Sequence, residues 1–119
     1  MVMRSPLLML ACTVAAVPAT AQDLAKRGGG DTIGNGRPVA CLFHTPPRER
    51  CTFYPRNGNG SFVLKRGNGR LYYATRTGPD TMRFSVSDGR DSVDVGGYAR
   101  SRDDRACWVR RPDRRICAW

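Results

Sequence analysis

The chain is poor in the side chains that most enzymes use for catalysis. It has one histidine, His44, and one glutamate, Glu49, in 119 residues. It has no serine in a Gly-x-Ser-x-Gly turn and no Cys-x-x-Cys pair, so the sequence signals of a hydrolase elbow and of a dithiol redox site are missing. Its glycine motifs precede expected strands rather than helices, which argues against a nucleotide-binding loop. These absences favour a function that does not depend on catalysis.

Two further absences concern metals and membranes. No two cysteines lie two to four residues apart, the spacing typical of structural zinc sites, and we therefore expect no metal and no cofactor. The apolar stretch from about Pro6 to Val17 is shorter than the ~20 residues that a membrane-spanning helix needs. We expect no transmembrane segment in the mature chain.

The same apolar stretch has the surroundings of a secretory signal. It follows a basic start at Arg4 and precedes the small residues Ala19-Thr20-Ala21. We expect a Sec-type signal peptide over residues 1–21, cleavage between Ala21 and Gln22, and a periplasmic or secreted product. Met9-Leu10-Ala11-Cys12 faintly resembles a lipoprotein signal, which is the alternative.

Cleavage would change both the cysteine count and the charge. It would remove Cys12 from the five cysteines and leave an even set of Cys41, Cys51, Cys107 and Cys117, which in a small exported domain predicts disulfides. It would also remove Arg4, so the net charge would fall from +10 for the whole chain to +9. A small domain with a marginal core is the kind that covalent links stabilise.

The four cysteines lie in two similar segments, CLFHTPPRERCTFY from residue 41 and CWVRRPDRRICAW from residue 107. In each, nine residues separate the cysteines, and proline and arginine occupy the middle. A β-ribbon with a three-residue loop centred on Pro46 or Pro112 would place Cys41 opposite Cys51 and Cys107 opposite Cys117. We favour this local pairing.

Two arguments keep the pairing open. A local bridge contributes about 2.8 kcal/mol by the chain-entropy estimate, and a bridge that closes almost the whole domain contributes about 4.5 kcal/mol, so stability alone favours the nested pairs Cys41–Cys117 and Cys51–Cys107. In addition, if Pro112 takes the first corner of a type I turn, Cys107 no longer faces Cys117. The nested arrangement is therefore the alternative.

The rest of the mature chain predicts a leader and one β domain. Residues 22–36 have no apolar periodicity and many glycines, which indicates a flexible leader. Residues 37–119 alternate short aromatic and β-branched segments with Gly, Asn, Asp and Pro, a pattern typical of all-β domains. We expect a single small, disulfide-stapled antiparallel sandwich or open barrel of short hairpins, with about six to eight strands.

Two hairpins have enough pattern to suggest a register. A two-residue turn at Asp88-Gly89 would pair Phe84 with Val93 and Met82 with Val95, with Arg83 facing Asp94 on the other side. A similar turn at Asn68-Gly69 would place Leu64 opposite Tyr73 and Val63 opposite Ala74. The second hairpin carries apolar groups on both faces, so we expect both of them to be covered. Gly96-Gly97 suggests a bulge.

Positive charge is the strongest functional signal. The chain has 20 Lys and Arg against 10 Asp and Glu, and many arginines with a few interleaved aromatic residues lie near its C-terminus. Arginine binds phosphates and carboxylates in pairs of hydrogen bonds, and aromatic rings stack on bases or sugars. We expect a non-catalytic module that binds an anionic polymer or the outer-membrane surface, such as lipopolysaccharide, acidic polysaccharide or nucleic acid. The expected binding residues are Arg110, Arg111, Arg114, Arg115 and Trp108.

Three alternatives accompany this interpretation. His44 and Glu49, beside Arg48 and Arg50, could supply the acid, base and phosphate contacts of a small secreted nuclease. The protein could instead be a structural envelope component without a specific ligand. Trp108 could also pack in the core while the arginines merely line the wet face. The oligomeric state does not follow from the sequence.

Overall fold

The computed structural model describes residues 31–119, which fold into eight strands. The expected signal peptide 1–21 and most of the expected leader lie outside the described residues. In chain order the strands are β1 (Arg37–Phe43), β2 (Thr45–Arg56), β3 (Ser61–Arg66), β4 (Leu71–Gly78), β5 (Thr81–Ser87), β6 (Ser92–Arg100), β7 (Cys107–Arg111) and β8 (Arg114–Ala118). Within this part of the chain, no helix has the length and apolar character that crossing a membrane would require.

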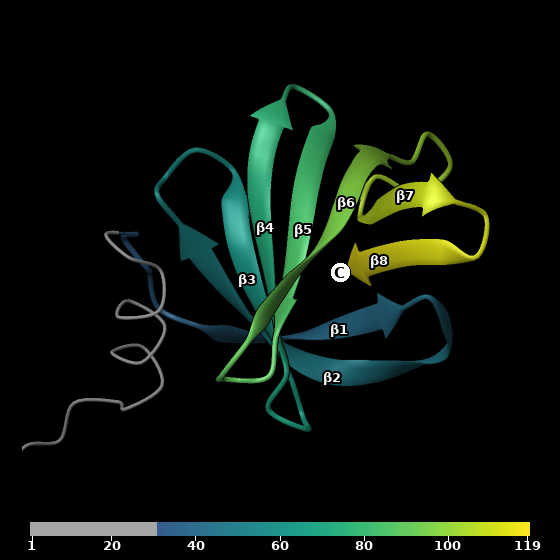
Figure 1. Ribbon diagram of the computed structural model, residues 1–119. Helices are drawn as coiled ribbons and strands as arrows, with labels where there is room; N and C mark the ends of the chain where they lie inside the picture. Colours follow the sequence, from purple (N-terminus) through teal and green to yellow (C-terminus); the bar gives the residue numbers. More distant parts are fainter. Residues whose placement is uncertain (1–30) are drawn as a thin grey trace, which may run out of the picture.

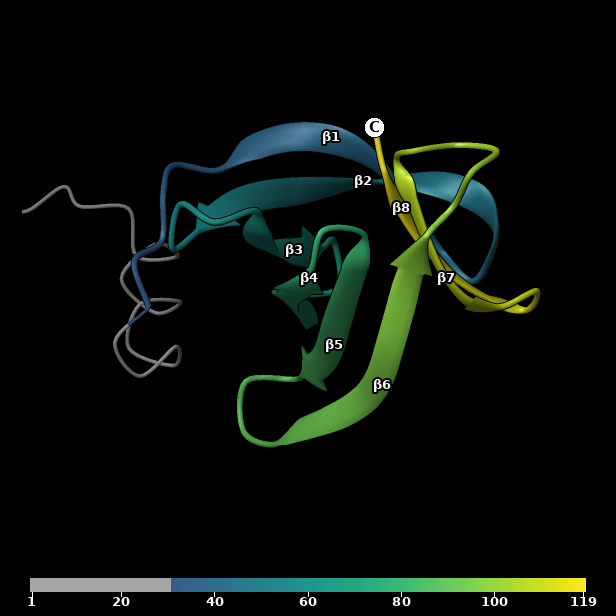
Figure 2. The ribbon, with the colours of Figure 1, turned by 90° about the horizontal axis from the view of Figure 1, so that it is seen from above.

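The strands form one closed antiparallel barrel in which each strand pairs with the next along the chain. Closure comes from β8, which returns to β1 so that Leu42 pairs with Cys117 and Phe43 with Ile116. Figure 1 shows β8 lying beside β1, with β2 on the other side of β1, and Figure 2 gives the view from above. The expected all-β, disulfide-stapled antiparallel fold is confirmed, and of the two architectures considered the protein has the barrel, with its sheet fully closed.

Strand alternation fills the interior of the barrel. Successive side chains of a strand point to opposite faces, so every second residue points inward. Phe62 and Leu64 of β3 are buried this way, and Phe84 of β5 is completely buried, with its ring against those of Phe62 and Tyr98. The inner cluster comprises Cys41, Phe43, Cys51, Phe62, Leu64, Tyr72, Ala74, Met82, Phe84, Tyr98, Trp108 and Ile116.

The outer face of the β3–β4 hairpin is also covered, as its two apolar faces predict. Tyr54, Val63, Leu71 and Tyr73 form a second cluster, and Ile33 packs on it from the segment before β1. This segment is held by Asp31, whose carboxylate accepts a hydrogen bond of 2.6 Å from Arg56 Nε. The last residues of the expected leader therefore lie on the barrel wall.

The local disulfide pairing is confirmed: Cys41 is bonded to Cys51, and Cys107 to Cys117. The first bridge does not join opposed residues, because Cys41 pairs with Glu49 and Cys51 pairs with Val39. The chain reverses at His44, which has a left-handed φ of 72°, and not at a loop centred on Pro46. The register on the ribbon is thereby shifted, and the bridge runs diagonally between inward-facing positions.

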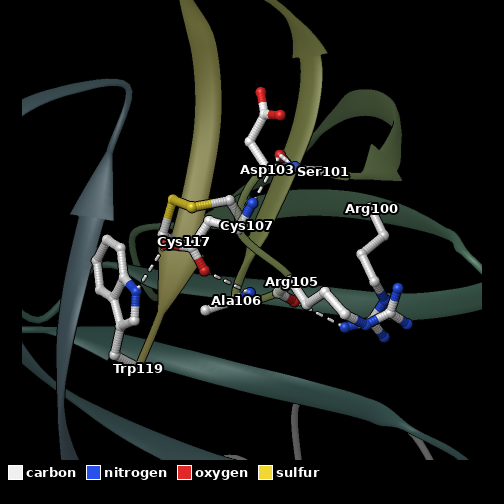
Figure 3. Close-up of a disulfide and its surroundings, with 9 residues drawn as sticks. Arg100, Ser101, Asp103, Arg105, Ala106, Cys107, Cys117 and Trp119 are labelled. Atoms are coloured by element: carbon white, nitrogen blue, oxygen red, sulfur yellow. Dashed lines mark hydrogen bonds between the residues drawn. A yellow bond between two sulfur atoms is a disulfide. The ribbon is translucent and has the colours of Figure 1, made fainter.

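The second bridge joins residues that do face each other, and a bulge explains how. Pro112 and Asp113 form a two-residue turn between the paired residues Arg111 and Arg114, which alone would misalign the cysteines. A register shift between Val109 and Arg111 leaves Arg110 as an extra residue and restores the alignment. Figure 3 shows the resulting bridge beside the loop that precedes β7.

Both predicted hairpin registers are wrong, and the turns explain why. In β5–β6, the Asp88 carboxylate accepts hydrogen bonds from the backbone N–H groups of Arg90 and Asp91, which widens the turn and pairs Ser87 with Ser92. A bulge beside Gly96 then places Phe84 opposite Gly96 and Met82 opposite Tyr98.

In β3–β4, the N–H of Arg66 donates to the carbonyl of Arg70 around a three-residue loop with Gly69 at a φ of 88°. Leu64 consequently pairs with Tyr72, one residue from the predicted register. The bulge expected in this part of β6 is present, with Val95 as its extra residue next to Gly96. The expected contact of Arg83 with Asp94 is also present, as an ion pair in which Arg83 Nε donates over 3.1 Å.

The Cys107–Cys117 bridge closes the hairpin whose last strand seals the barrel, and its removal should weaken the fold. We expect the double substitution Cys107→Ala/Cys117→Ala to lower the free energy of unfolding by about 2–3 kcal/mol, measured by urea denaturation. An unchanged urea midpoint would contradict this role.

The disulfide pairing can be checked by peptide mapping. Trypsin cuts at arginines between the two cysteines of each pair, so we expect a tryptic digest of the unreduced protein to contain peptides crosslinked within each pair. A peptide that joins Cys41 to Cys117 would overturn the pairing.

Candidate functional site

A cavity of about 620 Å³ opens at one end of the barrel. In an antiparallel meander every second turn lies at the same end, so the turns β1–β2, β3–β4, β5–β6 and β7–β8 all border this mouth. Its lining residues are His44, Arg66, Arg70, Tyr72, Val86, Val95, Tyr98, Arg110, Arg111 and Arg114. We refer to this set as the barrel mouth.

Strand alternation explains why arginines point into the mouth. Arg66 follows the buried Leu64 by two residues, and Arg70 precedes the buried Tyr72 by two, so both occupy the next inward position along their strands. Arg114 has the same relation to the buried Ile116. The inward-facing positions are thus apolar deep in the barrel and cationic where it opens.

Two of these arginines already have acidic partners. Arg66 donates two hydrogen bonds to the carboxylate oxygens of Glu49, at 3.1 and 2.7 Å, and its guanidinium lies 4.5 Å from the ring centre of Phe43. The hydrogen bonds to Glu49 raise the pKa of Arg66 further above its already high value. Arg111 Nε lies 3.2 Å from an Asp113 oxygen in an exposed pair.

The other three arginines of the mouth lack such partners. In residues 31–119, the side chains of Arg70, Arg110 and Arg114 form no hydrogen bond and no ion pair. The pKa of Asp88 is lowered mainly by the backbone N–H groups that donate to its carboxylate. The nearby positive charge of Arg70 is a smaller cause. Three guanidinium groups therefore keep free donors beside one cavity.

Arg110 owes its position to a glycine. It is the bulge residue of β7, and its side chain lies across Gly96 of β6, so that a Cβ on Gly96 would come within 2.6 Å of Arg110 Cζ. Gly96 also has a φ of 102°, which L side chains rarely adopt. The two bulges, one on each strand, thus fit together and aim Arg110 into the mouth.

His44 lines the same cavity and is kept neutral by its surroundings. Burial is the first cause of its lowered pKa, and the charges of Arg114 and Arg66 are the next, with Asp113 opposing them. Its Nδ1 atom is buried without a hydrogen-bond partner in the described chain. A neutral histidine can still donate or accept one hydrogen bond to a bound group.

The walls of the cavity below the arginines are apolar. Tyr72 and Tyr98 are buried, and Val86 and Val95 pack against the inner cluster. Burial raises the pKa of Tyr98, so its hydroxyl stays protonated at neutral pH. The site therefore combines cationic donors at the opening with hydrocarbon and ring surfaces inside.

Comparisons with known proteins do not assign this arrangement to a family. Protein-family models, curated proteins and solved structures each gave no match to the chain. Among residues 31–119, no group of three or more His, Cys, Asp or Glu side chains could hold a metal ion. The chemistry of the mouth is the guide to function.

The structure separates the five residues that the sequence suggested for binding. Arg110, Arg111 and Arg114 do line the mouth. Arg115 pairs with Val109 and, as the neighbour of the inward-facing Arg114, points to the outer face. Trp108 is buried in the inner cluster, and Arg100 stacks on its ring at 4.3 Å, so it offers no surface to a ligand.

Sequence reasoning missed the contribution of β3 and β4. Arg66, Arg70 and Tyr72 lie about forty residues from the arginine-rich C-terminus, and closure of the barrel brings them to the same cavity. A signal was present: an arginine two positions from a core residue at a strand end points inward. Using it required the correct register of the β3–β4 hairpin.

The predicted pair His44 and Glu49 is divided. His44 lines the mouth, whereas Glu49 is engaged through both carboxylate oxygens by Arg66 and does not line that cavity. Glu49 instead lines a different cavity, beside Arg48 and Trp119.

Gly96 provides a test of the interlocked bulges. We expect Gly96→Ala to lower the free energy of unfolding by about 1–3 kcal/mol, because alanine is strained at this φ and its Cβ meets Arg110. Gly97→Ala is the matched control, since a Cβ on Gly97 would meet nothing within 4 Å and its φ is ordinary. Urea denaturation measures both; equal effects would contradict the interlock, and Arg110→Ala should relieve part of the Gly96→Ala loss.

His44 reports the charge of the mouth, and as the sole histidine it gives one set of imidazole NMR signals. We expect its pKa to lie below 6.5 and to rise in Arg114→Ser, with Arg102→Ser as the control that leaves it unchanged. Because folding lowers this pKa, the stability it contributes is present above pH 6.5 and is lost as the pH falls through the folded-state pKa. If the pKa of His44 were the same in Arg114→Ser as in the wild type, the placement of Arg114 beside His44 in the mouth would be contradicted.

Proposed function

We propose that this protein is a non-catalytic binding module for an anionic partner, and that the barrel mouth is its binding site. The observation that carries the proposal is the set of three guanidinium groups, on Arg70, Arg110 and Arg114, that face a cavity and form no hydrogen bond or ion pair within residues 31–119. Arginine binds phosphate and carboxylate through paired, charge-assisted hydrogen bonds. Lipopolysaccharide, acidic polysaccharide and nucleic acid all carry such groups.

The charge of the site is suited to anions. Arginine remains charged even where cations crowd, whereas a lysine would lose its proton more readily. A bound anion would relieve the repulsion among the guanidinium groups and would accept hydrogen bonds that they now leave unused. Binding would therefore be strengthened by the same crowding that destabilises the empty mouth.

We further propose that the protein acts outside the cytoplasm, in the periplasm or as a secreted protein. Two disulfides support this location, because such bonds persist in oxidising compartments. The expected signal peptide agrees with it. An envelope location would place the mouth among anionic surfaces.

A secreted nuclease using His44 and Glu49 is the competing function. The position of Glu49 opposes it, since both carboxylate oxygens are held by Arg66 and the side chain does not line the cavity that His44 lines. A gel assay with RNA separates the two functions. Binding without cleavage is the expected result, and cleavage that is lost in His44→Ala would favour the nuclease.

Charge-matched variants test the location of the site. We expect the triple variant Arg70→Ser/Arg110→Ser/Arg114→Ser to weaken binding of heparin fragments and lipopolysaccharide by at least tenfold, measured by isothermal titration calorimetry. The control removes the same charge from exposed positions outside the mouth, with Arg50→Ser/Arg102→Ser/Arg105→Ser. Binding by the wild type should weaken as salt increases, because ions screen these charges.

The comparison of the two variants decides the proposal. An equal loss in both would indicate attraction by net charge rather than a site at the mouth. No loss in either variant, or an affinity that does not respond to salt, would contradict the proposal altogether.

A further inference from the structure

We infer that the ligand of the barrel mouth is an anionic amphiphile, a molecule with a phosphate or carboxylate head and a hydrocarbon body. This inference rests on the proposed anion site and specifies what that site selects. Its basis is the order of side chains from the opening of the cavity toward the barrel interior, with arginines at the opening and apolar side chains next to them further inside.

Strand pairing fixes this order. Arg66 and Arg70 face each other across the β3–β4 hairpin through a backbone hydrogen bond, and the next inward-facing pair below them is Leu64 with Tyr72. Tyr72 pairs in turn with Val86 on β5. A head group held by the arginines would therefore direct its remaining atoms against Tyr72 and Val86.

The same apolar layer continues to the rim on β6. Val93 pairs with Val86 and remains 61% exposed, one of the two large hydrophobic side chains that are exposed in residues 31–119. Since paired residues point to the same face of the sheet, Val93 lies on the same side of the β5–β6 hairpin as the inward-facing Val86. Val93 is not itself a lining residue, but it adjoins the lining residue Val86 and adds an exposed apolar side chain next to the cavity.

The size of the cavity and its chemistry favour an amphiphile over a wholly polar polymer. A volume of about 620 Å³ is in the range of sites that enclose small ligands, which are mostly apolar with a few polar groups that set orientation. A polysaccharide or nucleic acid chain would occupy the arginines but would make little use of the apolar surface that Val86 and Val95 present to the cavity. Of the three anionic partners proposed above, lipopolysaccharide is the amphiphile.

A series of ligands with one head group tests the inference. Inorganic phosphate, butyl phosphate, hexyl phosphate and octyl phosphate are titrated into the wild-type protein below their micelle concentrations, by calorimetry. We expect the affinity to increase about two- to fourfold for each added methylene until the cavity is filled, because each one leaves water for an apolar surface. Equal affinities along the series would overturn the inference.

Variants separate the head site from the apolar wall. Val86→Ser should lower the ratio of the affinity for octyl phosphate to the affinity for inorganic phosphate. Val93→Ser should lower the same ratio at an exposed position, where the substitution does not put folding at risk. Arg110→Ser should weaken the whole series by a similar factor. A chain-length dependence that survives in both valine variants would overturn the assigned wall.

The failures of the two proposals differ. If phosphate binds at the mouth and chain length has no effect, the amphiphile inference fails and the anion site stands. If the series binds equally well to the Arg70→Ser/Arg110→Ser/Arg114→Ser variant, the proposed function itself fails, together with the inference that rests on it.

Discussion

Closure of the sheet between β1 and β8 is the constraint on which the rest of the structure depends. It removes both free edges of the sheet and makes an inside, so that alternation along each strand sorts side chains into core and surface. It also joins distant parts of the sequence, since Arg66 and Arg70 reach the same cavity as Arg110 and Arg114. The local disulfide at Cys107 and Cys117 secures the hairpin that completes the closure.

The mouth concentrates positive charge, and repulsion among these charges lowers the stability of the fold. Contacts within the mouth reduce this repulsion. Glu49 neutralises Arg66, whose guanidinium also stacks on Phe43, and burial with the neighbouring arginines keeps His44 uncharged. The remaining guanidinium groups lie at an opening to solvent, where water screens them. Sites with unused binding capacity of this kind are often functional, because a ligand can supply the missing partners.

Much of the architecture could be predicted from the sequence, because strand periodicity and turn residues are local signals. The all-β class and the favoured disulfide pairs followed from them. The register of the β5–β6 hairpin did not, since the Asp88 side chain and the bulge beside Gly96 set details that propensity does not specify. Trp108 illustrates the same limit for the site: it shares β7 with Arg110 and Arg111, and the facing strands decide which of these side chains is buried. Arg66 and Arg70 required the tertiary fold.

The central claim is that anions bind inside the barrel mouth and not on the outer basic surface. A crystal structure of the protein with octyl phosphate tests it most directly. The account predicts a phosphate within hydrogen-bonding distance of the guanidinium groups of Arg110 and Arg114, with its chain against Tyr72 and Val86. Phosphate bound solely at outward-facing residues such as Arg102 or Arg115, with an empty mouth, would contradict it.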